Sequence, residues 1–446
     1  MKEEMEKKII VLDDDPTGCQ TVHGINVYTT WKVDSLNDAF LETNNLFYIL
    51  TNSRSLTPNQ TQTLHRELIQ NIVKISKKFK CDFDIISRSD STLRGHYPLE
   101  PDVIREELEK NGKSFNGEFI IPFFKEGGRI TKGDVHYIEQ GNLKVPAGES
   151  EFAKDATFGY KSSNLKEWIE EKTQGAYAAG KVKSISLDIL RSDNLEAIVR
   201  LISKSEKDQK YVVNATTYED LEPFVTALKS QELKSKSFIF RTAASFVKVY
   251  GAISDKPLLS GNQMRQDKYQ RGGLVIVGSH VQKTTMQLNN LINNTKIKAY
   301  ELDVFINKDQ IIKSIEYIVE ELSNNIEKGI NSVIYTSRKL LKDPHNDAEK
   351  NLKIAVDISN YLVSILDKLS PVPGFIIAKG GITSSDIATK GLRIKKALVL
   401  GQILPGIPVW QPDEKSKFPK VPYVVFPGNV GEINSLSLAL TILDKK

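Results

Sequence analysis

Short apolar runs alternate with longer amphipathic stretches along the first half of the chain. The apolar runs are rich in branched and aromatic residues, which is typical of buried strands, and the longer stretches carry apolar residues at helical spacing. We expect strands at Ile9–Leu12, Leu46–Leu50, Phe83–Ile86, Phe119–Ile121, Val182–Ser186 and Tyr211–Asn214, and helices at Gln60–Lys77 and Pro101–Asn111.

The second half repeats this alternation with different residues. We expect strands at Leu274–Val277, Ser332–Thr336, Gly374–Ala378 and Tyr423–Phe426, and helices at Gln287–Asn293, Asp309–Lys328 and Asp347–Lys368. Strands that alternate with helices predict an α/β fold, in which each sheet is mostly parallel and is flanked by helices.

A polar, glycine-bearing stretch without periodicity separates the two halves. The length of 446 residues also favours more than one domain, since domains average roughly 150 residues. We predict an N-terminal domain at 1–256, a linker at 257–272 and a C-terminal domain at 273–446.

Composition narrows the class of protein. The net charge of +5 is close to neutral for this length and gives no support for nucleic acid as the partner. The cysteines Cys19 and Cys81 are too few for a disulfide framework. No apolar run approaches the roughly 20 residues that cross a bilayer, and the charged N-terminus lacks a signal core. We therefore expect a cytoplasmic protein with no membrane partner.

An acidic loop follows the first expected strand. Asp13, Asp14 and Asp15 are adjacent, and their mutual repulsion favours a partner such as a cation or a polyol hydroxyl. A single aspartate would suffice for the ordinary alternative, a helix cap. Two chemistries fit this loop. Asp13 and Asp15 with Thr17 match the DxDxT pattern of haloacid dehalogenase-type phosphatases, whereas Asp14 or Asp15 as a proton acceptor fits phosphoryl transfer to a hydroxyl.

The phosphatase hypothesis also requires a second acidic pair after a strand. The candidate pairs begin at Glu106, Glu170 and Glu320, and all three lie in segments with helical periodicity. The helical setting of these pairs weakens the phosphatase hypothesis.

Hydroxyl and guanidinium groups follow the next two expected strands. Ser53 and Arg54 follow one strand, and Asp90, Ser91 and Arg94 follow the other. Arginine binds a carboxylate through two parallel hydrogen bonds, which suits an acidic ligand. The ordinary alternative is a loop arginine paired with a nearby aspartate.

A glycine-bearing loop follows the expected strand Phe119–Ile121. Gly128 allows close approach of the backbone to a ligand, and Arg129 and His136 supply donors. For His136 a hydrogen-bonded structural role is at least as good an interpretation as catalysis, and the histidines show no metal-ligand spacing.

Glycine turns follow three expected strands of the second half. They contain Gly278-Ser279, Gly380-Gly381-Ile382-Thr383 and Gly428, and a helix is expected after the second turn from Ser385. A strand, a glycine turn and a helix can direct backbone N–H groups at phosphate. There is no GxxxxGK[ST] motif, so a nucleotide must bind by another arrangement. Lys379 is a further phosphate candidate, although an exposed loop lysine is its ordinary interpretation.

Together these motifs resemble the four-carbon acid sugar kinase family. The family's DDxTG motif corresponds to Asp14, Asp15, Thr17 and Gly18, and its DSTLRG motif to the segment from Asp90 to Gly95. The later matches, in the expected order, are Gly128, Arg129, His136, Gly278, Ser279, Gly380, Gly381, Thr383, Gly428, Asn429 and Gly431. The chain departs from the family pattern at Arg88, Ile382, Phe426 and Pro427, among other positions.

The resemblance implies an ATP-dependent kinase that phosphorylates the terminal hydroxyl of an acid such as threonate, erythronate or 3-oxo-tetronate. It implies a two-domain protein with the active site in the interdomain cleft, Mg²⁺ on the ATP phosphates and a homodimeric assembly. Asp14 or Asp15 would accept the proton. The implied substrate-binding residues are Thr17, Gly18, Ser53, Arg54, Asp90, Ser91, Arg94, Gly128, Arg129 and His136. The implied ATP-binding residues are Ser279, Gly380, Gly381, Ile382, Thr383 and Gly428, with no protein ligand to the metal. Ile382 and Pro427 also motivate a degenerate kinase that acts as a sugar-acid sensor.

Overall fold

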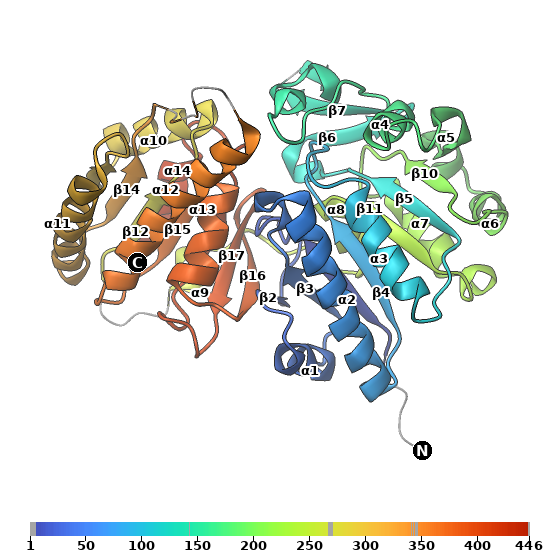
Figure 1. Cartoon of the computed structure of the whole chain (residues 1–446), viewed down its shortest axis with the longest axis horizontal. Helices are drawn as coiled ribbons and strands as arrows, with labels where there is room; N and C mark the ends of the chain where they lie inside the picture. Colours follow the sequence, from blue (N-terminus) through green and yellow to red (C-terminus); the bar gives the residue numbers. More distant parts are fainter. Residues whose placement is uncertain are drawn as a thin grey trace. The chain divides into compact units, whose positions relative to one another are not determined.

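The computed structural model describes residues 6–141, 143–265, 271–339, 341, 343 and 347–444. The described chain forms two compact units (Figure 1). The first unit comprises the chain up to Thr21 together with Thr30–Ser254, and the second comprises Val22–Thr29 together with the chain from Asp255 onward.

The first unit contains a parallel sheet, as the alternating pattern predicted. Its strands, in spatial order, are β3 (Leu46–Leu50), β1 (Lys8–Asp13), β4 (Phe83–Arg88), β11 (Phe238–Thr242), β5 (Gly117–Ile121), β10 (Lys210–Val213) and β9 (Lys183–Ile185). Every neighbouring pair in this order is parallel. Most of these strands are rich in apolar residues, as expected for a sheet that helices cover on both faces.

Helices and a small antiparallel sheet complete the first unit. The helices are α1 (Val33–Leu41), α2 (Pro58–Phe79), α3 (Leu99–Glu109), α4 (Leu165–Lys172), α5 (Leu187–Leu190), α6 (Leu195–Ser203), α7 (Leu221–Leu228) and α8 (Ala244–Tyr250). The small sheet consists of β6 (Arg129–Lys132), β7 (Val135–Gln140) and β8 (Leu143–Pro146). Helices α2 and α3 pack side by side over the strands (Figure 1), and a Thr57–Gln60 capping box begins α2. The expected strands and helices of this half are confirmed, but β2 (Ile25–Tyr28), β11 and the small sheet were not predicted.

The second unit contains a mixed sheet. Its strands, in spatial order, are β13 (Lys298–Leu302), β14 (Ser332–Thr336), β12 (Leu274–Val277), β15 (Ile376–Lys379), β18 (Tyr423–Phe426), β17 (Ile407–Pro412), β16 (Lys396–Leu404) and β2. The strands from β13 to β18 are parallel, and the pairs from β18 to β2 are antiparallel. The helices are α9 (Gly261–Met264), α10 (Gln282–Asn294), α11 (Lys308–Glu327), α12 (Ala348–Lys368), α13 (Gly381–Asp386) and α14 (Ser435–Asp444).

One helix begins earlier than the sequence indicated. The expectation of a helix from Ser385 is wrong, because α13 begins at Gly381. Its hydroxyl-rich sequence has low helix propensity, but the Ser384 hydroxyl donates to the Ala378 carbonyl at 2.8 Å and Tyr423 Oη donates to the Ser384 carbonyl at 2.5 Å. Tertiary hydrogen bonds therefore stabilise the first turn of α13. Within the segment expected as a linker, the structure contains α9, and residues 266–270 of that segment lie outside the described residues.

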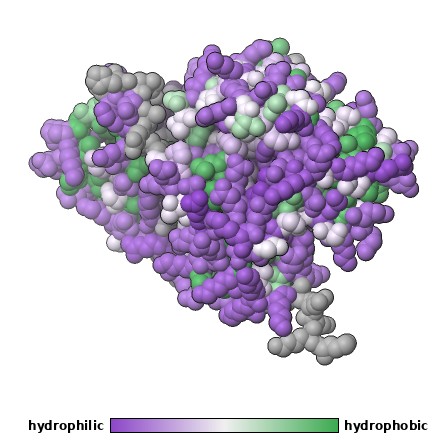
Figure 2. Space-filling view, turned by 45° about the vertical axis from the view of Figure 1, so that its right-hand side comes forward, coloured by the Kyte–Doolittle hydropathy of each residue, from purple (hydrophilic) through white to green (hydrophobic). Residues whose placement is uncertain are grey.

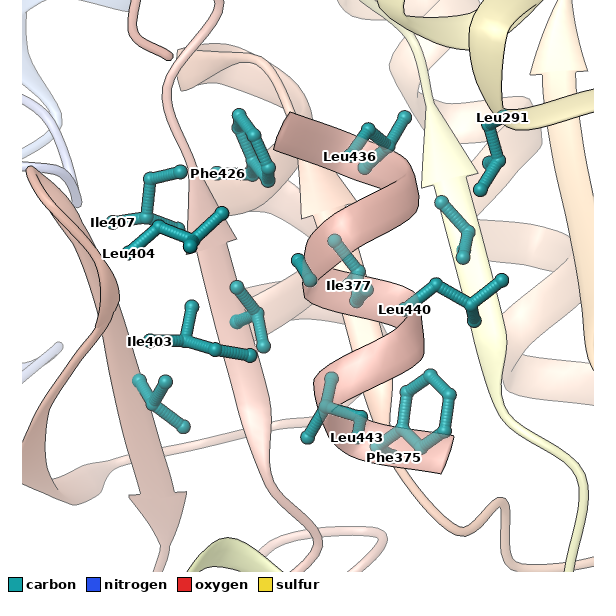
Figure 3. Close-up of a cluster of buried hydrophobic side chains, with 14 of the residues drawn as sticks. Leu291, Phe375, Ile377, Ile403, Leu404, Ile407, Phe426, Leu436, Leu440 and Leu443 are labelled. Carbon is teal, nitrogen blue, oxygen red and sulfur yellow. The ribbon is translucent and has the colours of Figure 1, made fainter. Parts of the chain in front are cut away.

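A single apolar core holds α14 against the sheet of the second unit. Leu436, Leu440 and Leu443 of α14 belong to the same cluster of buried side chains as Ile377 and Phe426 (Figure 3). Each fully buried side chain of this kind contributes roughly 1.5–3 kcal/mol. In the view of Figure 2, polar and charged side chains cover most of the surface, with small hydrophobic patches between them. None of the helices in the described ranges is long and apolar enough to span a bilayer.

Candidate active site

Strand register brings the predicted loops of the first unit to one edge of its sheet. Leu50 pairs with Asp13, Asp13 with Arg88, Arg88 with Thr242, and Thr242 with Ile121. The four predicted strand ends are therefore level, and the end of β11 lies among them. In an open parallel sheet this carboxyl edge is where ligands bind.

Asp13 is an internal anchor of the acidic loop. Its carboxylate is 3.1 Å from Arg88 Nη1, and a Cβ added to Gly18 would lie 2.0 Å from Asp13 Oδ1. Burial raises the pKa of Asp13 to about 8, aided by the charges of Asp14 and Asp15 and opposed by Arg88. The glycine at position 18 is thus required by the buried carboxylate that packs beneath it.

Asp14 has the properties of a proton acceptor. Its Oδ2 accepts a hydrogen bond from the Asp90 N–H at 3.3 Å, and Arg88 and Arg54 lie 3.5 and 4.0 Å from its carboxylate. Burial raises the pKa of Asp14 to about 6, although Arg54 and Arg88 favour ionisation. A carboxylate with a pKa close to neutrality suits general base catalysis.

Arg54 is held by carboxylates of its own unit. Its guanidinium forms a close ion pair with Asp15 and lies 3.4 Å from Asp90. Although burial opposes ionisation, Arg54 and the Thr17 hydroxyl hold the pKa of Asp15 below its usual range. The geometry therefore gives Arg54 the role of joining the aspartates.

The segment from Asp90 to Gly95 forms a tight loop stabilised by its own side chains. Arg94 Nε donates to Asp90 Oδ2 at 2.7 Å, and the Thr92 hydroxyl donates to the same oxygen. Despite burial, Arg94 and Arg54 hold the pKa of Asp90 well below its usual range. Gly95 has φ +117°, and a Cβ there would lie 3.2 Å from Asp14 Oδ2. This loop consequently packs directly against Asp14.

Arg129 differs from the other predicted arginines. It begins β6 and is 6% exposed, yet among the described residues no carboxylate lies within ion-pair distance and its Nε has no hydrogen-bond partner. Burial lowers the pKa of Arg129 to about 10, Arg94 contributes in the same direction, and Asp90 opposes. A buried cation without a counterion is costly and indicates a site for an anion.

His136 holds the same loop from the other side. Its Nε2 donates to the Ser91 carbonyl at 2.8 Å, and its Nδ1 accepts from the Thr131 hydroxyl at 2.9 Å. Burial lowers the pKa of His136 to about 4. A neutral ring with both nitrogens engaged fits the structural interpretation better than catalysis.

Ser53 was predicted for this site, whereas two charged residues near it, Glu100 and Arg241, were not. Ser53 is buried, and its hydroxyl donates to Glu100, which also accepts from the Ser89 hydroxyl at 3.4 Å. Sequence reasoning did not identify Glu100, or Arg241 on β11. The mostly apolar run Phe238–Thr242, with Arg241 near its end, could have indicated a strand that brings an arginine to the site.

The glycine turns of the second unit converge on Ser279. Register pairs Tyr335 with Val277, Val277 with Lys379, and Lys379 with Phe426, so these strand ends are also level. A Cβ added to Gly380 would lie 2.8 Å from Ser279 Cβ, and one added to Gly428 would lie 3.1 Å from Ser279 Oγ.

Thr383 also lies at this convergence. A Cβ added to Gly278 would lie 2.2 Å from Thr383 Oγ1, and the Thr284 hydroxyl donates to the Gly428 carbonyl at 3.1 Å. Gly381 and Ile382 form the first turn of α13 beside it. All the predicted ATP residues are therefore within one set of adjoining turns.

Lys379 is buried, contrary to its ordinary interpretation from the sequence. It is fully buried at the end of β15, and Nζ donates to the Pro427 carbonyl at 2.6 Å. Burial lowers the pKa of Lys379 well below its usual range. The interpretation as an exposed loop lysine is wrong, because the neighbouring strand β18 and its turn cover this side chain.

Arg338 adds a basic group that sequence reasoning missed. It follows β14, donates to the Ser279 carbonyl, and donates to the Thr285 hydroxyl at 2.9 Å. Its Nη1 has no partner within the described ranges. The described residues contain no group of three His, Cys, Asp or Glu side chains that could hold a metal ion.

Comparison with known domains matches both units. A sugar-binding N-terminal domain matches residues 9–250, and a nucleotide-binding C-terminal domain matches residues 274–436. The chain is thus a two-domain protein with a sugar-binding part and a nucleotide-binding part. It belongs to the four-carbon acid sugar kinase family, also designated DUF1537.

Solved structures show the same fold. A crystal structure from Salmonella typhimurium LT2, provisionally described as a tRNA synthase, has a TM-score of 0.66 and 16% identity and covers 97% of this chain and 98% of that chain. A Haemophilus influenzae protein of the DUF1537 family has a TM-score of 0.60 and 17% identity and covers 97% of this chain and 100% of that chain. No curated protein matches the chain significantly. Identities this low show the fold alone.

Proposed function

We propose that the protein is an ATP-dependent kinase that phosphorylates the terminal hydroxyl of a four-carbon sugar acid of the threonate, erythronate or 3-oxo-tetronate type. One observation carries this proposal: the buried guanidinium of Arg129 has no carboxylate partner in the described chain, and the loop that leads to it leaves the same edge of the sheet as Asp14, whose pKa is about 6. A hydroxy acid offers an anion for the arginine and a hydroxyl for the carboxylate.

In the proposed reaction, the acceptor hydroxyl oxygen forms a bond to the γ-phosphorus as the β,γ-bridging bond breaks. ADP leaves with that electron pair, and the hydroxyl proton passes to the Asp14 carboxylate. Asp15 is the weaker candidate for the proton acceptor because its ion pair with Arg54 keeps its pKa low. Direct transfer requires the triphosphate and the acid to meet during the reaction.

Each predicted arginine has a distinct part in the proposal. Arg129 binds the substrate carboxylate, whereas Arg54 and Arg94 hold Asp15 and Asp90 in place. Thr17, Gly18, Ser53, Ser91, Gly128 and His136 shape the loops around them. The resemblance implied a substrate-binding role for all three arginines, and the proposal keeps direct contact with the substrate for Arg129 alone.

The proposed nucleotide site is the set of turns around Ser279. Gly380 and Gly428 bring backbone close to this residue, and Arg338 supplies a cation at the same strand ends. Mg²⁺ would offset charge on the phosphates while bound to them.

Two alternatives fit the structure less well. A phosphatase would use Asp13 as the nucleophile, but Asp13 is 1% exposed, paired with Arg88 and covered by Gly18. The acidic pairs at Glu106, Glu170 and Glu320 all lie inside α3, α4 and α11, not after strands. Ile382 and Pro427, which depart from the family pattern, are the argument for a sugar-acid sensor. The turns that carry them nevertheless lie close to Ser279, as a nucleotide site would require.

A screen of four-carbon acids tests the proposal. Purified protein is incubated with ATP, Mg²⁺ and each acid in turn, and ADP and the phosphorylated acid are quantified. Calorimetry with ATP and Mg²⁺ is run in parallel. Turnover of at least one acid is expected. Nucleotide binding without turnover would favour the sensor, and phosphate release from sugar phosphates without ATP would favour the phosphatase.

The variant Asp14→Asn tests the proposed base. We expect at least a 100-fold loss of kcat, since general bases contribute about 10²–10⁴-fold, with nucleotide affinity unchanged. In the wild type, kcat/KM should fall as pH decreases through about 6, because Asp14 becomes protonated. Full activity of this variant would remove Asp14 from the mechanism.

A further inference from the structure

Arg241 is a buried arginine in the middle of the parallel sheet of the first unit. It lies on β11, between β4 and β5, and is 1% exposed. Phe238 and Phe240 project to the opposite face and pack among aromatic side chains, as strand alternation requires. The Arg241 guanidinium instead lies 5.7 Å from the ring of Trp168. Its position therefore directs a charge toward the loop from Asp90 to Gly95.

The contacts of Arg241 lead to Asp14. Arg241 Nη2 donates to the Arg94 carbonyl at 3.1 Å. The Cβ position of Gly95 lies 3.7 Å from Arg241 Nη2 and 3.2 Å from Asp14 Oδ2. The turn at Gly95, with φ +117°, separates the guanidinium from the carboxylate by a single residue without a side chain.

The charge of Arg241 is not neutralised by a direct ion pair. Among the described residues, no carboxylate oxygen lies within 4.0 Å of its guanidinium. Burial lowers the pKa of Arg241, and the charge that most opposes this effect is that of Asp14, followed by Glu100 and Asp90. A buried arginine of this kind is costly unless a nearby anion benefits from it.

Two other arginines face Asp14, and each is shared with a further carboxyl group. Arg54 also pairs with Asp15 and Asp90, and Arg88 also contacts Asp13. Both arginines favour ionisation of Asp14. Glu100, on α3, adds a further negative charge that disfavours ionisation of Asp14. Arg241 thus adds a third cation near Asp14, and within the described residues its charge is not shared through an ion pair with another carboxylate.

We propose that Arg241 is a positioning residue for the transfer reaction: it holds the Arg94–Gly95 backbone against Asp14 and adds to the positive charge that favours the ionised Asp14 carboxylate. This inference rests on the proposed function, because it matters only if Asp14 accepts the proton. It adds a residue that does not touch substrate and that no motif of the sequence indicated.

The test is the pH dependence of kcat/KM in the variants R241Q and R241K. The assay uses Mg²⁺-ATP and whichever of threonate, erythronate and 3-oxo-tetronate is turned over fastest. We expect the acidic limb, near pH 6 in the wild type, to move about one pH unit upward in R241Q and by less in R241K, which keeps a charge at greater distance. A residue that only supported the fold would lower the rate equally at every pH.

Arg105→Gln is the matched control. Arg105 is half-buried in this unit, and it pairs with Glu118 and Asp208 rather than with a residue of the acidic loop. In Arg105→Gln the acidic limb of the kcat/KM profile should stay at the wild-type pH. A folded R241Q whose limb is unshifted would overturn the inference.

Two further measurements keep the outcome interpretable. If R241Q does not fold, the carboxyl NMR resonance of Asp14, assigned by its absence in D14N, is titrated in the wild type and in R241K. A higher apparent pKa in R241K supports the inference, and equal values refute it. If D14N retains turnover, the proposed role of Asp14 fails. If D14N is inactive while the limb of R241Q is unmoved, only the role of Arg241 fails.

Discussion

The arginines around the acidic loop differ in how their charges are balanced. Arg54, Arg88 and Arg94 each have an aspartate within 3.5 Å, whereas Arg129 has no such partner among the described residues. Motif spacing placed Arg54, Arg94 and Arg129 together but did not distinguish them. The distinction matters because a paired arginine holds structure, while an unpaired buried arginine favours a ligand anion.

Substitution of Arg129 should separate binding from stability. In Arg129→Met we expect at least a 100-fold weaker affinity for the acid, since a buried charged hydrogen bond contributes about 2–5 kcal/mol. The melting temperature should be unchanged or higher, because an uncompensated buried charge is removed. Calorimetry and thermal unfolding measure the two effects. Arg66→Met is the control, because Arg66 is a half-buried arginine of α2 that pairs with Glu106 and Glu107 of α3. A folded Arg129→Met variant with normal affinity would contradict the assignment.

Asp13→Asn should change stability in a pH-dependent manner. The folded-state pKa of Asp13, about 8, is above its unfolded value of 3.8, so its contribution to stability is greatest below pH 4 and is lost as pH rises through 8. The variant lacks this titration. Relative to the wild type, it should gain roughly 1 kcal/mol per pH unit between pH 5 and 8, as measured by urea unfolding.

Activity of the same variant distinguishes the two chemistries of the acidic loop. Under the kinase proposal, Asp13→Asn should retain activity within about tenfold, because Asp13 anchors the loop through Arg88 without touching the substrate. A phosphatase that uses Asp13 as its nucleophile would be inactive in this variant.

At the scale of elements, strand ends and turns determine both candidate sites. The apolar runs correctly predicted β1, β3, β4 and β5, because buried parallel strands are continuously apolar. The run of β11 was missed although it lies in the centre of the sheet, between β4 and β5. Because β11 was missed, Arg241 was missed as well. The sequence does not show which strands lie beside β11, and so it does not show which groups Arg241 faces.

A substitution at Gly380 tests the convergence of turns in the second unit. Gly380 has φ +115°, and an added Cβ would lie 2.8 Å from Ser279 Cβ. We expect Gly380→Ala to weaken ATP binding at least tenfold by displacing Ser279, as measured by calorimetry. Gly112→Ala is the matched control, since Gly112 has φ +86° with nothing within 4 Å of its Cβ position. The control should lose a comparable amount of stability but keep its ATP affinity, and equal ATP affinities in both variants would contradict the site.

At the scale of the molecule, the two domain matches predict a separation of ligands. The sugar-binding match covers 9–250 and the nucleotide-binding match covers 274–436. We expect Arg129→Met to lose affinity for the acid without loss of ATP affinity, and Gly380→Ala to show the reverse. Each affinity is measured by calorimetry with the other ligand absent. Loss of both affinities in one folded variant would contradict separate sites.

The sequence by itself determined the alternating α/β pattern, most of the strands, and the loops that carry Asp14, Arg129 and Ser279. It did so because strand periodicity and turn glycines are local properties that each segment carries alone. Only the tertiary structure decided which arginine is paired, that Lys379 is buried, that α13 begins at Gly381, and that Arg241 and Arg338 join the sites. Those outcomes depend on burial and on charges from segments distant in the chain, and neither is a property of a local pattern.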